Sequence, residues 1–120
     1  MNYQETVRKL SAVCAPSGFE APVMDVIEEL AKPFATDMRR DALGSLIVHR
    51  AGSGSRVMLA AHADTFGMIL TFRDEKGFYR FGLLGEAEPA QLIGLPVVFA
   101  NGARGVVGCD GGVEKPALRN

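Results

Sequence analysis

The sequence has 120 residues, of which 48 % are hydrophobic and 22 % are charged, and its formal net charge is −1. This composition is ordinary for a globular domain, and it excludes the strongly basic surface that nucleic acids or anionic membranes would attract. No apolar run approaches the ~18 residues of a membrane-spanning helix, and the N-terminus lacks the order of a secretory signal. We therefore expect a cytoplasmic protein that binds neither nucleic acid nor membranes.

The N-terminal residues have the pattern of two helices. Apolar residues recur at steps of three and four within 3–14, and again from residue 21 up to about Lys32. Pro16 follows the first pattern and Pro33 follows the second, and each would stop its helix. Ser17 and Glu20 have the S-x-x-E spacing of a capping box, so we expect them to cap the second helix.

The rest of the chain has the pattern of strands joined by glycine-containing turns. Strands are predicted at 36–40, 45–50, 56–63, 68–73, 78–84, 96–100 and 104–108, with one helical turn at 89–93. The strand at 56–63 is apolar on both faces, which is typical of a sheet that is covered on both sides. We predict an α/β fold, with an α/β domain at 1–66 and a small β-rich domain at 67–120, incomplete at its C-terminus.

The candidate site lies at the end of the predicted strand 56–63. His62 and Asp64 are two residues apart, so their side chains would point the same way from an extended chain. Open α/β sheets form their sites beyond the carboxyl ends of the strands. An imidazole can coordinate a metal through one nitrogen while a carboxylate fixes the proton on the other. The alternative is a histidine with a structural role only.

Other candidate ligands are weaker. A catalytic zinc site usually needs three protein ligands, yet the other histidine, His49, has no carboxylate partner in sequence and should face solvent. Asp110 lies in a glycine-rich tail. Cys14 and Cys109 are not part of a C-x-x-C pair, so we expect two small buried or half-buried side chains and no disulfide.

Several motifs occur in a fixed order along the chain. They are P-S-G-F-E at 16–20, D-x-L-G-S-L-I at 41–47, V-M-L-A-A-H-A-D at 57–64, D-E-K-G-F-Y-R-F at 74–81 and G-x-V-G at 105–108. Together they resemble the N-terminal portion of the M42 family of metalloaminopeptidases, whose relatives include glutamyl aminopeptidases and proteins also described as cellulases. The resemblance covers nearly the whole chain and weakens after Gly108.

The resemblance implies a hydrolase that removes N-terminal residues from peptide substrates. It implies that residues 1–66 are the N-terminal part of a zinc-peptidase-like α/β sandwich, which is interrupted by a small, barrel-like, β-rich dimerisation domain. It also implies self-association into dimers and, in full-length relatives, dodecamers. It also implies two divalent metal ions, zinc or cobalt. His62 would be a metal ligand, and Asp64 would be the catalytic-site carboxylate that orients it.

The sequence departs from the family pattern in two respects. The family commonly reads A-H-x-D-E-[IV]-G. Here Thr65 replaces the acidic residue of this pattern and Phe66 replaces the branched aliphatic residue, so the substrate site should differ in detail. The remaining ligands and the general base of the family have no counterpart among the residues present. Since a single His–Asp pair binds a metal weakly and lacks that base, we expect the 120-residue chain to be inactive alone.

Two other functions are compatible with parts of the sequence. The β-rich residues 68–108 could serve as a non-catalytic oligomerisation or binding module derived from such an enzyme. A sugar hydrolase would need two facing carboxylates, and Asp64 has no evident partner because Glu86 and Glu88 lie in a predicted loop.

Overall fold

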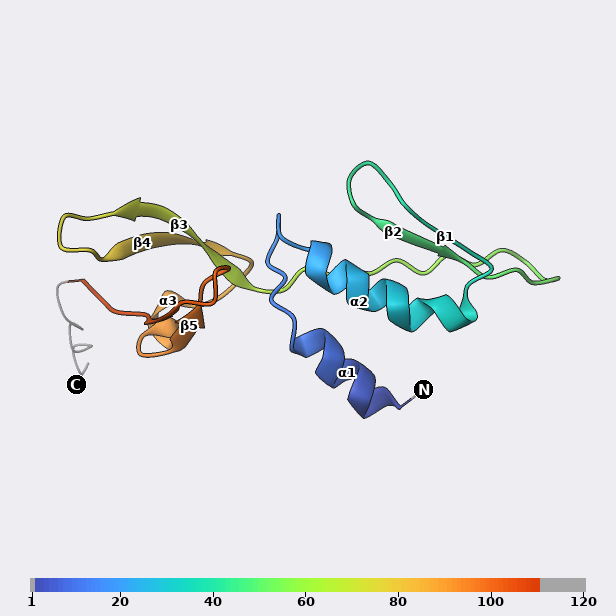
Figure 1. Ribbon diagram of the computed structural model, residues 1–120, viewed down its shortest axis with the longest axis horizontal. Coiled ribbons are helices and arrows are strands. Elements are labelled where there is room, and N and C mark those ends of the chain that lie inside the picture. The colour runs from blue at the N-terminus through green and yellow to red at the C-terminus, as the bar shows by residue number, and fades with distance from the viewer. Residues whose placement is uncertain (1, 111–120) are drawn as a thin grey trace, which may run out of the picture. The chain divides into compact units, whose positions relative to one another are not determined.

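The computed structural model describes residues 2–110, and the chain divides between Gly85 and Glu86 into two compact units (Figure 1). The first unit contains two helices and two β-hairpins, and the second contains one helical turn and one hairpin. An α/β protein with short sheets is therefore confirmed. The assignment of residues 1–66 to a peptidase domain and of residues 67–120 to a dimerisation domain stays a prediction. The expected incomplete C-terminus, beyond Asp110, lies outside the described residues.

The two predicted helices are present in the first unit. Helix α1 is Tyr3–Ser11, and the side chain of Asn2 caps it by accepting a hydrogen bond from the Gln4 N–H at 3.1 Å. Helix α2 is Ala21–Ala31 and continues into a 3₁₀ turn, η1, at Lys32–Phe34. Helix α1 ends earlier than predicted.

The predicted capping box of α2 is wrong. Glu20 occupies the N-cap position, but its side chain accepts a hydrogen bond from the Gly18 N–H at 2.7 Å and caps no helical N–H. The Ser17 hydroxyl is directed to a carboxylate elsewhere in the chain, described below. In a capping box the serine would itself be the N-cap residue and its oxygen would accept a helical N–H, whereas Ser17 lies three residues before the N-cap of α2.

Six strands form three antiparallel hairpins. They are β1 (Asp37–Arg40), β2 (Leu46–His49), β3 (Gly67–Arg73), β4 (Tyr79–Leu84), β5 (Pro96–Val98) and β6 (Arg104–Val106). Each hairpin is a separate two-stranded sheet, so no barrel is formed by the part of the chain that the structure describes. All of these strands were predicted, and helix α3 (Pro89–Leu92) corresponds to the predicted helical turn.

The three hairpins share one loop geometry. Each loop ends in a glycine with positive φ, namely Gly44, Gly77 and Gly102 at +87°, +88° and +83°. In β1–β2 and β3–β4 the loop begins with an aspartate, Asp41 or Asp74, whose Oδ1 accepts two main-chain N–H groups at 2.8–3.0 Å. Loops of this kind combine a tight turn with a glycine bulge, so residues within the loop determine the register of the strands.

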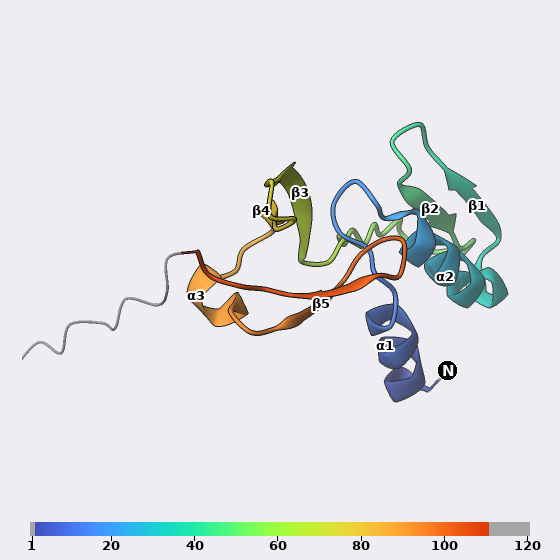
Figure 2. The ribbon, with the colours of Figure 1, turned by 60° about the vertical axis from the view of Figure 1, so that its left-hand side comes forward.

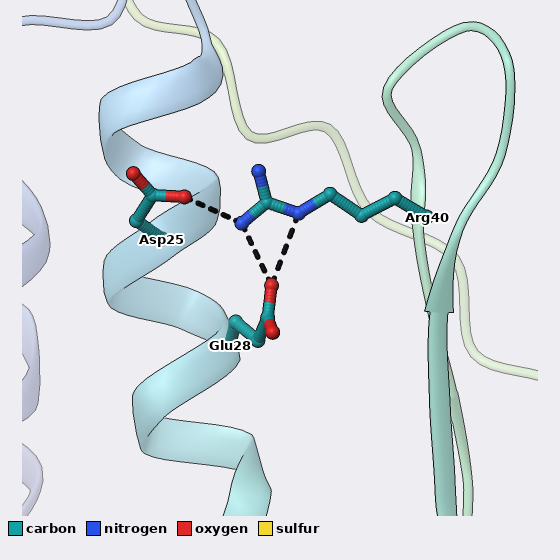
Figure 3. Close-up of polar contacts among 3 residues, drawn as sticks. All are labelled: Asp25, Glu28 and Arg40. Atoms are coloured by element: carbon teal, nitrogen blue, oxygen red, sulfur yellow. Dashed lines mark hydrogen bonds and ion pairs between the residues drawn. The ribbon is translucent and has the colours of Figure 1, made fainter.

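Arg40 joins the β1–β2 hairpin to α2 (Figure 3). Its Nη2 lies 2.6 Å from Asp25 Oδ1 and 2.8 Å from Glu28 Oε2, and its Nε donates to the same Glu28 oxygen at 3.0 Å. Asp25 and Glu28 are three residues apart on α2, so both carboxylates lie on the face that meets the hairpin. These bonds raise the pKa of Arg40 further above its usual range.

The predicted strand at 56–63 is wrong. Figures 1 and 2 show this segment, between β2 and β3, as extended chain without a strand. Val57, Met58 and Leu59 are 83 %, 89 % and 94 % exposed. A strand requires a neighbouring strand for its main-chain hydrogen bonds, and within residues 2–110 no strand pairs with this segment. The apolar side chains of this segment are therefore exposed, although their pattern predicted a strand buried on both faces.

The buried core is small in each unit. Ala15 and Val23 are buried in the first unit, and Leu92 and Val107 are buried in the second, where the Val107 N–H donates to Leu95 O at 3.0 Å. These are the only buried hydrophobic residues in the described part of the chain. Within residues 2–110, no helix has both the length and the apolar character required to cross a membrane.

Candidate metal site

The extended segment after Leu59 brings His62 and Asp64 together, as predicted. His62 Nδ1 lies 3.1 Å from Asp64 Oδ1 and 3.1 Å from the Asp64 main-chain oxygen. Two acceptors at the same nitrogen favour the tautomer that carries its proton on Nδ1. The other ring nitrogen, Nε2, then presents a lone pair, and the ring is open to solvent because 86 % of the side chain is exposed. The role of His62 as a metal ligand stays a prediction.

Ser17 is the functional candidate that sequence reasoning missed. Its Oγ donates a hydrogen bond of 2.5 Å to Asp64 Oδ2, the carboxylate oxygen that does not face His62. This hydrogen bond, with smaller contributions from His62, holds the pKa of Asp64 below its usual range. Asp64 is therefore a carboxylate, able to accept hydrogen bonds on both oxygens. No local pattern could have found the pair, because the two residues are 47 positions apart.

Main-chain contacts hold the Ser17 loop against the segment that carries Asp64. The Thr65 N–H donates to Ala15 O at 2.7 Å, and Pro16 forms an isolated parallel bridge with Thr65. Ala15 is fully buried. Gly67 allows Pro16 to approach, because a Cβ at position 67 would collide with the Pro16 Cβ. The site is thus located where residues 15–17 meet residues 64–67.

A groove of about 640 Å³ lies beside His62 and Asp64. Its walls come from the start of α2, from the β1–β2 hairpin and from the segment 61–64. Phe19 and Leu43 contribute apolar surface, and Glu20 and Arg40 contribute charge. The groove can therefore accommodate a ligand with apolar and charged groups next to His62.

The other candidates do not join this site as ligands. His49 is exposed on β2, as predicted, and Glu20 lines the groove while holding the Gly18 N–H. Cys14 and Cys109 are exposed, so the expectation of burial is wrong, because the core in each unit is too small to cover them. The Cys109 thiol contacts the main-chain oxygen of Asp110 at 3.7 Å.

A complete metal site is not assembled by the described residues. Within residues 2–110, no three His, Cys, Asp or Glu side chains are close enough to hold one metal ion. His62 fits the donor type of a zinc or cobalt ligand, and Asp64 fits the carboxylate that orients such a ligand. These residues can thus supply one ligand and its support, and further ligands would have to come from elsewhere.

Residues 44–116 match the model of a family described as M42 glutamyl aminopeptidase. The lysyl aminopeptidase of Pyrococcus furiosus is 34 % identical over 119 residues, which cover 96 % of this chain and 33 % of that protein. The chain spans about a third of the length of the curated relatives that it matches.

Two solved structures are similar in fold as well as in sequence. An aminopeptidase from the archaeon Desulfurococcus kamchatkensis has a TM-score of 0.78 and 30 % identity, over 97 % of this chain and 33 % of that one. The TET1 peptidase of Pyrococcus horikoshii, which can assemble into a tetrahedron or a large octahedral shell, has a TM-score of 0.76 and 29 % identity. That match covers 99 % of this chain and 36 % of the peptidase.

Proposed function

Because the chain belongs to the M42 glutamyl aminopeptidase family, we propose that it forms the N-terminal portion of a metal-dependent aminopeptidase. The proposed reaction is the removal of N-terminal residues from peptides. The observation that carries the proposal is the His62–Asp64 pair, in which one ring nitrogen is held by the carboxylate and the other is open. The proposed location is the cytoplasm, on the sequence pattern alone.

In the proposed site, His62 is a ligand for one of two divalent ions, zinc or cobalt. Such ions polarise a carbonyl group and activate water for its hydrolysis. The residues of this chain would present the Nε2 lone pair of His62, hold the His62 proton on Nδ1 through Asp64, and line the adjacent groove. The groove has both apolar and charged lining residues beside His62, which is suited to binding part of a peptide.

Self-association is part of the same proposal. The assembly of the Pyrococcus horikoshii TET1 peptidase into a tetrahedron or a large octahedral shell supports self-association, and we infer that the β3–β4 hairpin contributes to a dimer contact. Ile69, Phe72 and Phe78 on this hairpin are all more than half exposed, and large exposed apolar side chains are typical of interfaces. The same exposed side chains favour an alternative, a non-catalytic binding module. Such a module would assemble equally well with and without a chelator, because its assembly would not require a metal ion.

Metal binding tests the site directly. We expect the 120-residue chain to bind Zn²⁺ or Co²⁺ weakly and to lose this binding in His62→Ala. His49→Ala is the matched control, because it removes the other imidazole from an exposed position on β2. Equal binding by the wild type and His62→Ala, measured by calorimetric titration, would argue against His62 as a ligand.

Peptide hydrolysis tests the reaction. The chain alone should be inactive, whereas a chimera in which it replaces the matched third of the Pyrococcus furiosus lysyl aminopeptidase should release N-terminal residues from peptides. An acetylated peptide should resist cleavage, since an aminopeptidase requires a free N-terminus. The proposal is wrong if a folded, metal-loaded chimera is equally active with and without His62→Ala.

A further inference from the structure

Three side chains form a connected row that ends at the open nitrogen of His62. Ser17 Oγ donates to Asp64 Oδ2 at 2.5 Å, and Asp64 Oδ1 faces His62 Nδ1 at 3.1 Å. Each partner of Asp64 uses a different carboxylate oxygen. The terminal torsion of an aspartate is broad and soft, so a bond to one oxygen limits where the other can point. By holding Oδ2, the Ser17 hydroxyl therefore influences whether Asp64 Oδ1 stays within reach of His62 Nδ1.

The main-chain position of the Ser17 loop does not depend on the bond that the Ser17 hydroxyl makes. Residues 15–17 are held by the Thr65 N–H to Ala15 O bond at 2.7 Å and by the Pro16–Thr65 bridge. The Phe19 N–H closes the turn by donating to Pro16 O at 2.8 Å. None of these contacts uses Ser17 Oγ. Removing the hydroxyl should therefore leave the loop in place and release only the Asp64 carboxylate.

We propose that Ser17 is a positioning residue, which fixes the carboxylate of Asp64 and thereby keeps the His62 proton on Nδ1 and its lone pair on Nε2. In a neutral imidazole, the hydrogen bond at one nitrogen decides which tautomer is present. If Asp64 turns away, Nδ1 keeps only the Asp64 main-chain oxygen, at 3.1 Å, as an acceptor, so the preference for the Nδ1–H tautomer weakens. The tautomer with its proton on Nε2, which has no lone pair to offer there, then becomes more populated. This inference rests on the proposed function for its purpose.

The test is the tautomer of His62 in the metal-free chain, read from ¹⁵N chemical shifts by NMR. The pH is raised until the ¹⁵N shifts of both histidines no longer change with pH, so that only neutral rings are compared. His49, exposed on β2, serves as the reference within the same molecule. The variants are Ser17→Ala, Ser17→Thr as the rescue that retains a hydroxyl, and Ser53→Ala as a matched control in an exposed loop.

We expect Nδ1–H to predominate at His62 in the wild type, in Ser17→Thr and in Ser53→Ala. In Ser17→Ala the distribution should move toward that of His49, while the amide shift of Thr65 stays unchanged because its anchor is retained. The inference is overturned if wild-type His62 carries its proton mainly on Nε2. It is also overturned if Ser17→Ala leaves the tautomer unchanged, or if Ser17→Thr fails to restore it.

Failure of the proposed function would look different. If His62 binds no metal and the chimera cleaves no peptide, the aminopeptidase proposal fails, yet the Ser17-dependent tautomer can still be observed. Conversely, a chimera with His62-dependent activity, together with a tautomer that ignores Ser17, would remove the positioning role alone.

Discussion

The β-hairpins and the segment at 56–67 show opposite ways in which a sequence determines structure. Each hairpin contains both of its strands and a loop that sets their register, so its structure is decided within about ten to twenty residues. In the segment at 56–67, the fixed contacts that precede β3 come from residues about fifty positions earlier, namely Ala15, Pro16 and Ser17.

The contrast explains why equally apolar stretches have different outcomes. In β3 and β4, main-chain groups pair across the hairpin even though several apolar side chains stay exposed. In the segment at 56–61, the main chain has no strand to pair with among the described residues, and the apolar side chains are exposed as well. Burial is therefore not what makes these hairpins form; the nearby pairing partner is.

The most disruptive change should be at the contact between the distant segments. Gly67→Ala places a Cβ against the Pro16 Cβ, and we expect it to reduce the free energy of unfolding by about 3 kcal/mol, at the upper end of the range for overpacking. Gly52→Ala is the control, because nothing lies near a Cβ there. Urea unfolding measures the stability of both variants. Equal midpoints would show that the close contact between Pro16 and position 67 is not required for stability.

A pair of identical substitutions sharpens the contrast between buried and exposed apolar residues. Val23→Ala in α2 should cost about 2 kcal/mol, from two lost methyl groups and the cavity they leave, because Val23 is only 3 % exposed. Val57→Ala should change the free energy of unfolding by less than about 0.5 kcal/mol. If thermal unfolding shows that Val57→Ala is as costly, the segment at 56–61 is covered in solution by a partner.

The hairpins should be sensitive to their loop glycines. Gly44→Ala forces an L side chain into a φ of +87° and should cost about 1 kcal/mol. Gly54→Ala, in the open connection after β2, should cost almost nothing, since its φ is not in this range. Amide hydrogen exchange of β1 and β2 checks the result, and unchanged protection in Gly44→Ala would mean that the loop does not set the register.

The smallest effect should be a pH dependence confined to the β1–β2 loop. Hydrogen bonds from the Ser45 and Leu43 N–H groups hold the pKa of Asp41 below its usual range. A lowered folded-state pKa gives stability that is present above the unfolded value of about 3.9 and is lost as the pH falls through the folded value. Amide shifts of Ser45 should report this loss below about pH 3.9.

Asp41→Asn is the variant that isolates the charge in this loop. Its amide oxygen can accept the same two main-chain hydrogen bonds, so the turn should be retained. Its Ser45 amide shift should then be flat through the acid range. A transition that persists in Asp41→Asn would assign the pH dependence to another group.

The elements that depend on neighbours in sequence could be predicted from the sequence, whereas the elements that depend on distant residues could not. The apolar steps of α2 and the aspartate and glycine of the β1–β2 loop are local signals, and the structure confirms both elements. The predicted strand at 56–63 is absent because a continuous apolar run indicates that a segment can pair, not that a partner is present.

The candidate site was predicted in part for the same reason. His62 and Asp64 are two positions apart, so an extended chain alone brings them together. Ser17 escaped because its local spacing to Glu20 indicated a cap, while its actual acceptor lies 47 positions away. The groove beside the pair was equally hidden, since its walls come from three parts of the chain that are separate in sequence.

The Ser17–Asp64 contact also has a consequence for the order in which the molecule folds. Bringing together residues 47 positions apart costs more chain entropy than closing the four-residue span of the Asp41–Ser45 loop, by roughly 2 kcal/mol. The hairpins should therefore form early in refolding, and residues 62–65 should acquire their fixed arrangement late. In pulse-labelled hydrogen exchange, the Thr65 amide should become protected after the Asp41 amide.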